Sequence, residues 1–485
     1  MTVSEWIAYV DQRVWGPGML VLLMGTGVFL TLRTRFLPWR NLGWALKSVL
    51  GRASRAKAGG AGDVSPFSAL MTTLAATIGT GNIVGVATAL VAGGPGALVW
   101  MEISALFGLS SKCAECLLAV KYRQRDAGGE MRGGPMYTMC AALRWKRLGG
   151  ALAFLFALFT VLASLGMGDM AQANSIAGAL ADSFSVPART TGVAVALLAL
   201  VVILGGIRRI AGVCSVVVPL MAVLYLLAGT AVLLGHLSAL PGAVAEMFRL
   251  AFSPAAAAGG AAGTMTASAL NAARWGIARG CFSHEAGMGS APNAAAAADV
   301  SHPVKQGLVQ MLSVFIDTIL ICSTTAFMLL LSGVPIDAYS EGMNFVQAAV
   351  HSQVGPFGPL FITVSIFLFA FSSLVGNYYY TESNFRFIRD SKTGLLVFRL
   401  TCVAAIFIGA QMSFSMVWDL ADVLMGLMAL VNLVAILLLG GKAIRVLKDY
   451  QKQRRAGKNP VYRYDEVGVG SPEIWNEAHA KKWED

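Results

Sequence analysis

Charged residues are scarce in this chain. Only 13% of its 485 residues are Asp, Glu, Lys or Arg, whereas 56% are hydrophobic, and the mean hydropathy is +0.65. A soluble domain carries about 25% charged residues. The shortage argues against a water-soluble protein and favours a chain whose solvent is lipid.

Sets of catalytic or metal-binding residues are also lacking. The five histidines are scattered, and no Ser–His–Asp, nucleotide or metal-ligand motif stands out. Cys113 and Cys116 match a redox motif in spacing only, and the seven cysteines lie mostly in or beside apolar runs, as small buried hydrophobes do. We therefore expect no enzyme, no cofactor and no transition-metal site.

Long apolar runs, in contrast, fill the chain. A spanning helix needs roughly 20 apolar residues. Hydropathy predicts eleven spans, at residues 15–32, 66–91, 97–120, 151–180, 190–205, 211–234, 263–290, 304–332, 358–380, 395–410 and 415–439. The first lacks the basic start and the small-residue cleavage site of a signal peptide, so it is predicted to be a retained helix.

Basic residues alternate between the connections. If the amino terminus is outside, the inside connections hold 30 Lys and Arg and the outside ones hold 3. This is the positive-inside pattern; it predicts an outside amino terminus and a cytoplasmic tail. The net charge of +11 therefore points to a membrane protein rather than to a nucleic-acid partner.

Two spans are interrupted at their midpoints by residues that a continuous helix disfavours. The first break is residues 77–82 (TIGTGN), and the second is residues 280–287 (GCFSHEAG). Glycine inside a helix costs about 1 kcal/mol relative to alanine, and broken helices at membrane depth persist only where the freed backbone lines a cavity or is buried in protein. A matched pair of breaks is typical of the binding site of a secondary transporter.

The breaks divide the chain into two groups of five spans, each opening with a broken helix. Because five is odd, a second copy enters the membrane from the opposite side, which predicts an inverted repeat with both breaks near the midplane. The expected segments are an outside amino terminus with an additional first helix (1–32), a cytoplasmic basic loop (33–65), the first repeat (66–235), an extracytoplasmic connection with room for a short helix (236–262), the second repeat (263–440) and a cytoplasmic polar tail (441–485).

At the first break, the amide groups at the start of the second half-helix favour a substrate carboxylate. Carbonyl groups released before the break favour a cation, and Thr80 and Asn82 add side-chain donors or acceptors. The spacing of Gly81 and Gly85 also fits a close helix-packing face. At the second break, carbonyl groups at Gly280 and Cys281 are predicted to receive the substrate amino group.

Other polar groups at membrane depth need a partner or a role. Phe282 is expected to close the pocket, and Glu285 to hold the unwound backbone. Asp317 has either a structural role or a direct role with an ion or proton, and Gln172 either joins helices or contacts substrate. The adjacent hydroxyls of residues 372 and 373 either bond back to their own helix or form an oxygen cage for a monovalent ion.

The tail, rich in Lys, Arg, Tyr and Trp, is predicted to be solvated beside an anionic membrane surface.

Several strings of the sequence resemble the alanine/glycine:cation symporter family. They are Ala76–Ala87, Gly93–Ala97 with Trp100 and Met101, Ala114–Cys116 with Leu118 and Ala119, Arg132–Tyr137, Phe282 and Ser283 with Glu285–Pro292, and Phe315–Thr318. The resemblance implies an all-α integral membrane protein with a LeuT-type five-plus-five inverted repeat and one additional helix. It also implies uptake of alanine, glycine or serine driven by Na⁺, with H⁺ as the alternative coupling ion.

The resemblance also assigns candidate site residues. The substrate-binding set is Gly79, Thr80, Gly81, Asn82, Gln172, Gly280, Cys281, Phe282, Ser283 and Asn377, and the cation-binding set is Ala76, Gly79, Ser372 and Ser373. Two positions depart from the family pattern. His284 stands where Asn is usual, and Asn377 stands where many relatives have Trp, which bears on selectivity.

The expected partners are a small neutral amino acid, Na⁺ or H⁺, and the lipid bilayer. The chain is predicted to act as a monomer in the plasma membrane of a prokaryote, without a nucleic-acid partner. An ion channel is the competing class, but a channel does not require two opposed broken helices around an enclosed site.

Overall fold

The chain is almost entirely helical. The structure is a computed structural model that describes residues 2–51, 62–126, 128–252, 262–467, 470–471, 473–477, 479 and 483. Part of the predicted basic loop (52–61), part of the outside connection (253–261) and much of the final tail lie outside the described residues.

Helices account for nearly every described element. In order they are α1 (Val3–Val14), α2 (Pro17–Arg33), α3 (Leu37–Arg40), α4 (Leu42–Leu50), α6 (Pro66–Thr77), η1 (Thr80–Asn82), α7 (Val84–Gly93), α8 (Gly96–Lys121), α9 (Pro135–Ala142), α10 (Lys146–Ala163), η2 (Ser164–Met170), α11 (Ala171–Phe184), α12 (Ala188–Ile203), α13 (Gly206–Gly235), α14 (Leu240–Phe252), α15 (Ala262–His284), α16 (Pro292–Ala295), α17 (Pro303–Val314), η3 (Phe315–Cys322), α18 (Ser323–Leu330), η4 (Ile336–Ala338), α19 (Gly342–Val354), η5 (Gly355–Phe357), α20 (Gly358–Ile388), α21 (Lys392–Gly409), α22 (Phe414–Arg455) and α23 (Tyr464–Val467). Two short antiparallel strands, β1 (Gln124–Arg125) and β2 (Met131–Arg132), form a hairpin between α8 and α9.

Seven helical segments of the described chain are long and apolar enough to cross a membrane. The number is eight if α1 and α2, which meet at 42°, form one bent span. Helices α7 and α12 are apolar but shorter. These segments fit a multi-pass integral membrane protein, whereas the count of eleven spans stays a prediction.

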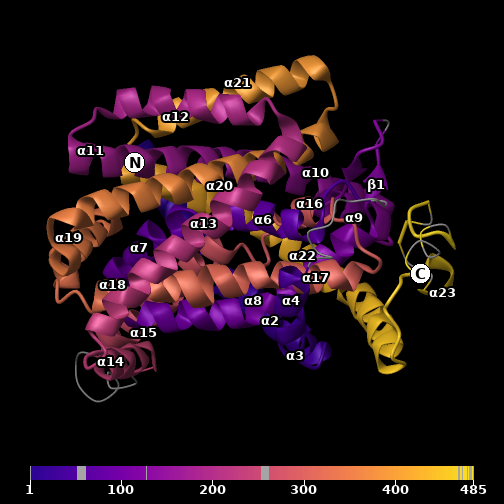
Figure 1. The fold of residues 1–485 in the computed structure, drawn as a ribbon, viewed down its shortest axis with the longest axis horizontal. Coiled ribbons are helices and arrows are strands. Elements are labelled where there is room, and N and C mark those ends of the chain that lie inside the picture. Colours follow the sequence, from indigo (N-terminus) through magenta and orange to yellow (C-terminus); the bar gives the residue numbers. More distant parts are fainter. Residues whose placement is uncertain are drawn as a thin grey trace.

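The long helices run side by side (Figure 1). Helices α12 and α21 lie together along one edge, α2 and α8 along the other, and α6, α13 and α20 between them. The hairpin, α9 and the C-terminal segment gather at one end, which we call the inner end, while α14 and α19 lie at the opposite end. Segments predicted to share a side of the membrane thus share an end of the molecule.

Two long spans contain π-helical turns. The segment η2 joins α10 to α11, and η3 joins α17 to α18, with continuous helical backbone on both sides. A π turn contains one residue more than an α turn and is often found at functional sites. Both π turns pack against elements of the broken spans or of α20.

The predictions for the extracytoplasmic connections and for the C-terminal tail need correction in part. The connection after α13 does carry a helix, α14, but the region before α20 carries a second helix, α19, that the hydropathy pattern did not indicate. The described part of the tail is solvated only in part: residues 454–459 are exposed, whereas Tyr462 and Trp475 are buried. The backbone N–H of Tyr462 donates to the carbonyl of Ser301 (2.9 Å), and the indole of Trp475 donates to the carbonyl of Lys121 (2.9 Å).

The tail folds back because its aromatic rings cover cations at the inner end of α8. The guanidinium of Arg123 lies 4.9 Å from the Trp475 ring, and the ammonium of Lys121 lies 5.1 Å from the Tyr462 ring. Burial lowers the pKa of Arg123 to about 10, and a cation–π contact compensates part of that lost hydration.

The same contact region contains a buried histidine that caps α17. His302 Nδ1 accepts from the backbone N–H of Val304 (3.2 Å), and Nε2 contacts Asp449 Oδ2 (3.1 Å). Burial lowers the pKa of His302 to about 4, although the hydrogen bond to Asp449 opposes this shift. The histidine is therefore neutral at pH 7, with its Nε2–H donating to Asp449.

This arrangement predicts a pH-dependent stability of the inner end. In the unfolded chain His302 takes up a proton near pH 6.5, whereas the folded chain resists protonation down to about pH 4. The stability that the neutral ring contributes is thus complete above pH 6.5 and declines as the pH falls toward 4. Thermal unfolding in detergent at pH 7.5 and 5 should show a smaller drop for His302→Asn, which keeps an N-cap acceptor. Equal drops in both proteins would refute the assignment.

Candidate functional site

The first predicted break is present in the structure. Helix α6 ends at Thr77, residues 78 and 79 are extended, and a single 3₁₀ turn, η1, leads into α7. The Asn82 side chain supports the break, because its Oδ1 accepts the backbone N–H of Gly79 at 2.8 Å. The extended residues 78 and 79 therefore lie within the predicted string, 77–82, and are stabilised by Asn82 of the same string.

Helix α20 packs directly against the first break. The Ser373 hydroxyl donates to the carbonyl of Ala76 at 2.6 Å, and a side chain on Gly79 would place its Cβ 2.7 Å from Ser373 Oγ. Ser372 donates to Phe369 (2.9 Å), as expected for bonding back to its own helix, and also contacts the carbonyl of Ile78 (3.4 Å). All four predicted cation-site residues thus lie together, and glycine is required at position 79 for this approach.

The amide of Gln172 fixes the break from another direction. Its Oε1 accepts the backbone N–H of Thr80 (3.1 Å), while its Nε2 donates to the carbonyl of Met167 in η2 (2.9 Å). The π turn thus supplies the acceptor that orients Gln172. The Thr80 hydroxyl is buried and has no partner within the described part of the chain, so it is available to a ligand.

Asn377 lies on the Ser373 side of the break. Its Nδ2 donates to the carbonyl and hydroxyl oxygens of Ser373 (3.0 and 3.2 Å) and lies 3.4 Å from the carbonyl of Ala76. On its other side it touches Gly168, where an added Cβ would lie 2.7 Å from Asn377 Cβ. Asn377 is thus grouped with the predicted cation residues.

The second break does not begin where the sequence predicted. Helix α15 continues through His284, and the carbonyl of Cys281 accepts the backbone N–H of Glu285 at 2.9 Å. Gly280 instead allows close contact with α8, since an added Cβ would lie 2.5 Å from Ser104 Oγ. The carbonyls of Gly280 and Cys281 lie inside a helix, so the prediction that they are unwound acceptors is wrong.

The helix ends at residues 284 and 285. His284 Nδ1 accepts the backbone N–H of Ala286 (3.0 Å), and Glu285 has a left-handed backbone (φ 53°). The Glu285 carboxylate accepts a hydrogen bond from Ser290 across the turn. His284 and Glu285 thus hold the unwound backbone of this break, as predicted for Glu285.

The last turn of α15 meets the first break. An added Cβ on Gly81 would lie 2.9 Å from the Phe282 ring and 3.4 Å from Ser283 Cα. Phe282 is stacked on Trp418 of α22, with ring centroids 4.9 Å apart. Of the four substrate candidates from the second string, Phe282 and Ser283 therefore lie against the first break.

A buried ion pair lies one turn before Phe282. Arg279 contacts Asp422 of α22, and the two side chains are 2% and 3% exposed. The guanidinium also lies 5.1 Å from the Trp418 ring and 5.2 Å from the Trp275 ring. Sequence reasoning missed this pairing and Trp418. The available signal was that both charged residues fall inside spans, where each needs a partner.

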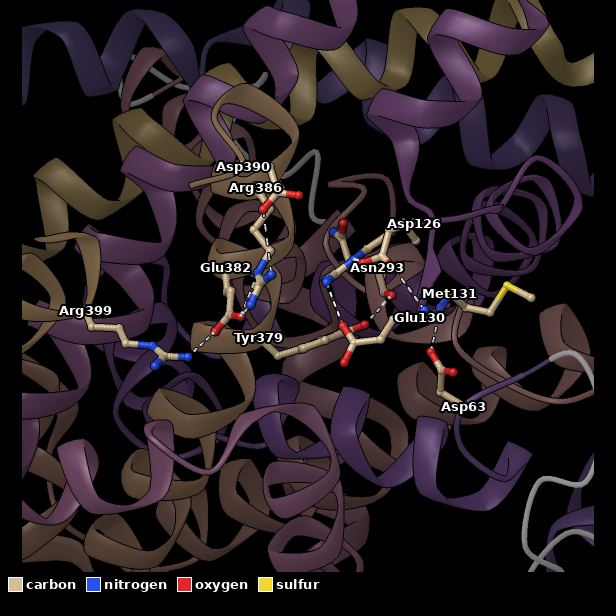
Figure 2. A network of polar contacts seen from close by, with 11 residues as sticks. Asp63, Asp126, Glu130, Met131, Asn293, Tyr379, Glu382, Arg386, Asp390 and Arg399 are labelled. Atoms are coloured by element: carbon tan, nitrogen blue, oxygen red, sulfur yellow. Dashed lines mark hydrogen bonds and ion pairs between the residues drawn. The ribbon is translucent and has the colours of Figure 1, made fainter. Parts of the chain in front are cut away.

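A polar network lies at the inner end of the molecule (Figure 2). The Asp63 carboxylate, just before α6, accepts the backbone N–H of Met131 in β2 (2.7 Å). Arg132 pairs with Asp126 (2.9 Å) and Glu130 (2.7 Å). Partial burial acts to raise the pKa of Asp126, but the hydrogen bond and charge of Arg132, together with backbone N–H groups of the hairpin turn, outweigh it and the pKa is lowered. The hairpin is thus fastened to the start of the first broken span.

The other half of this network belongs to α20 and α21. Glu382 pairs with Arg386 (2.7 Å) and Arg399 (3.5 Å), and Tyr379 donates to the carbonyl of Asn293 (3.4 Å) (Figure 2). A cavity of about 180 Å³ separates these groups from the hairpin. The Tyr379–Asn293 hydrogen bond lies between the two charged halves of the network. It joins α20 to α16, the short helix that follows the second break.

Comparison with known proteins places this chain among transporters. The model of the sodium:alanine symporter family matches residues 1–464. The sodium/alanine symporter AgcS of Methanococcus maripaludis is 43% identical over 448 residues, covering 92% of this chain and 97% of that protein. Two Bacillus subtilis proteins are each 40% identical: the amino-acid carrier protein AlsT, covering 95% of both chains, and the probable sodium/glutamine symporter GlnT, covering 95% of this chain and 93% of that protein. Each match runs through nearly the whole chain.

Proposed function

We propose that this chain, which belongs to the sodium:alanine symporter family, couples the inward movement of Na⁺ to the uptake of a small neutral amino acid. It is a secondary active symporter and not an enzyme, since the family is one of transporters. The substrates are alanine and glycine, with serine as a further candidate. One relative is named as a probable glutamine symporter, so competition by unlabelled glutamine belongs beside alanine, glycine and serine in the transport assay.

One observation carries this function: the first break is enclosed by two different kinds of group. On one side, hydroxyls of α20 meet carbonyls that precede the break. On the other side, Phe282 and Ser283 of α15 meet Gly81. Oxygen ligands suit a hard cation, whereas an aromatic wall beside unwound backbone suits a small organic substrate. Cation and substrate thus share one unwound segment, which is the physical basis of coupling.

The roles follow from the chemistry of the groups. The carbonyl oxygens of Ala76 and Gly79, with the hydroxyls of Ser372 and Ser373, form the Na⁺ site. The substrate carboxylate binds at the amino-terminal end of α7, where the helix dipole favours an anion. Thr80, Asn82 and Gln172 orient the backbone, and Phe282 covers the substrate side chain.

The transport cycle is alternating access in a LeuT-type fold. In this proposal residues 66–235 and 263–440 are the two five-span repeats, α2 is the additional helix, and the chain crosses the plasma membrane eleven times. The amino terminus is outside and the inner end faces the cytoplasm, in keeping with its excess of Lys and Arg. The network of Figure 2 then holds the cytoplasmic exit closed.

Counterflow of labelled alanine in proteoliposomes tests this function. The Na⁺ and pH gradients are imposed separately, so that a Na⁺-driven symporter, an H⁺-driven transporter of the same fold and a channel give different results. Uptake that follows the Na⁺ gradient and exchanges labelled for unlabelled alanine supports the proposal. Ion flux without solute coupling contradicts it.

The cation assignment predicts a selective defect in Ser373→Ala. Removing one of the oxygen ligands should raise the Na⁺ half-saturation at least fivefold, while the half-saturation for alanine at saturating Na⁺ changes less than twofold. The measurement is uptake against Na⁺ concentration at fixed alanine. Ser365→Ala is the control, because that hydroxyl bonds only to Phe361 of its own helix among the described residues. An unchanged Na⁺ half-saturation removes Ser373 from the site.

A further inference from the structure

A cavity of about 750 Å³ lies at the inner end, between elements that are far apart in the sequence. Helix α17 packs there against α4, α6 and α22 (Figure 1), and residues from all four helices line the cavity. Among the described residues of this lining, none belongs to either break or to the candidate cation site. The volume is within the range of about 300–1,000 Å³ that is usual for small-molecule sites. The cavity therefore has room for a ligand of its own.

Three cations line this cavity. They are Lys305 near the start of α17, Arg454 near the end of α22 and Lys458 just beyond that helix. No ion pair among the described residues includes any of them. The ammonium of Lys305 donates to Asn459 Oδ1 (2.7 Å), and the guanidinium of Arg454 donates to Asn41 Oδ1 (2.8 Å). Both are thus positioned by neutral oxygens, and their charges are not neutralised within the described part of the chain.

The acidic group of the lining, Asp299, is bound elsewhere. Its Oδ1 accepts the backbone N–H of Gly62 (3.3 Å), and its charge acts on Arg123. Asp449, on the same helix as Arg454, receives the Nε2–H of His302, as described above. With three cations and one carboxylate in its lining, the cavity carries a net positive charge and is complementary to an anion.

Aromatic rings indicate the depth of the cavity in the membrane. Trp44 of α4 and Tyr450 of α22 line it, and the guanidinium of Arg454 lies 5.7 and 6.0 Å from their ring centroids. Tryptophan and tyrosine are enriched where a membrane meets water. On the far side of α4, Leu46 and Leu50 are 36% and 74% exposed, as expected for a helix that lies against lipid. These features place the cavity at the depth of the phospholipid headgroups.

We propose that this cavity binds the headgroup of an anionic phospholipid of the inner leaflet. The phosphate group lies among Lys305, Arg454 and Lys458, and the first part of the acyl chains lies against Val309 and Pro66 of the same lining. A lipid fits better than a soluble phosphate, because the aromatic rings and the exposed leucines border an apolar phase. The inference uses the orientation proposed above, but it does not depend on the transported solute.

The position of the site gives the lipid a structural role. Pro66 begins the first broken span, and Lys458 belongs to the segment that leads from α22 into the folded tail. A lipid that contacts both residues joins the start of α6 to the end of α22. Its binding should therefore raise the thermal stability of the protein.

Native mass spectrometry of the full chain in neutral detergent micelles tests this proposal. Phosphatidylglycerol and phosphatidylcholine with the same acyl chains are titrated separately. We expect one phosphatidylglycerol molecule to stay bound per chain and to raise the unfolding temperature, at concentrations at which phosphatidylcholine does neither. Equal retention of the two lipids would overturn the proposal, because the charge of the headgroup would then be irrelevant.

The double variant Arg454→Gln with Lys458→Gln removes two of the three cations. Binding of phosphatidylglycerol should weaken about thirtyfold, as expected when two cations facing an anionic headgroup are lost. The matched control is Lys452→Gln with Arg455→Gln, which removes the same charge from α22 outside the lining and should weaken binding less than about threefold. All four side chains are exposed, so both variants should fold, and thermal unfolding without lipid checks this. Similar losses in both variants would show attraction to a basic surface and overturn the site.

Two further measurements identify the source of the phosphate and the place of binding. Excess inorganic phosphate at constant ionic strength should leave phosphatidylglycerol bound, whereas displacement would assign the cavity to a soluble phosphate and overturn the lipid. Phosphatidylglycerol with brominated acyl chains should quench the tryptophan fluorescence of wild type more strongly than that of Trp44→Phe. Equal fractional quenching in the two proteins would place the lipid away from Trp44 and overturn the proposal.

Discussion

Gly81→Leu is expected to abolish alanine binding, with affinity reduced more than a hundredfold, while the protein still folds in detergent. The Cβ alone would lie 2.9 Å from Phe282 Cδ1 and 3.4 Å from Ser283 Cα. The ring cannot turn aside easily, because it is stacked on Trp418. The rest of the leucine side chain must then fill the space between the two breaks, where the substrate binds in our proposal.

The measurement is binding of labelled alanine to purified protein, with thermal unfolding recorded in parallel. Gly81→Ala should give an intermediate loss. Gly25→Leu is the matched control, because Gly25 lies exposed on α2 and an added Cβ there meets nothing within 4 Å. Wild-type binding by well-folded Gly81→Leu would place the substrate elsewhere.

Arg279→Met is expected to destabilise the folded protein by about 3–5 kcal/mol, because it leaves the Asp422 carboxylate buried without its partner. Both side chains are almost fully buried. A double variant, Arg279→Met with Asp422→Leu, should recover at least half of the lost stability, since a buried ion pair can be replaced by apolar residues of similar volume.

Equilibrium unfolding in mixed detergent micelles measures both effects. Arg249→Met is the control, since its ion pair with Glu246 on α14 is exposed and should contribute nothing measurable. A single variant as stable as wild type, or a double variant as unstable as the single, would contradict the expected coupling.

The first break could be predicted because its cause is local. Two glycines and an asparagine within four residues disfavour a helix, and Asn82 supports the broken backbone three residues from Gly79. The approach of Ser373 to Ala76 followed from the family resemblance, which aligned both with a cation site. Composition alone would not have brought together residues almost 300 positions apart.

The second break was predicted at the wrong position because a glycine can either interrupt a helix or allow two helices to pack closely. Gly280 was interpreted as a helix breaker, whereas in the structure it lets α15 pack closely on α8. The helix ends instead at His284, directly before Glu285, a non-glycine residue with positive φ, which sequence patterns rarely indicate. The folded tail was missed for a related reason. The partners of Trp475 and Tyr462 lie at the end of α8, far away in the sequence.

The two π turns have a consequence for how the long spans can move. Each holds one residue more than an α-helical turn, and each lies next to a residue that touches a break, Gln172 beyond η2 and Asp317 within η3. If a π turn tightens to α geometry, the helix beyond it advances by about 1.5 Å and rotates by about 100°. These two spans can therefore change length and rotate their polar side chains while the helical backbone stays hydrogen-bonded. Such a combined translation and rotation of a span inside the membrane requires no hinge.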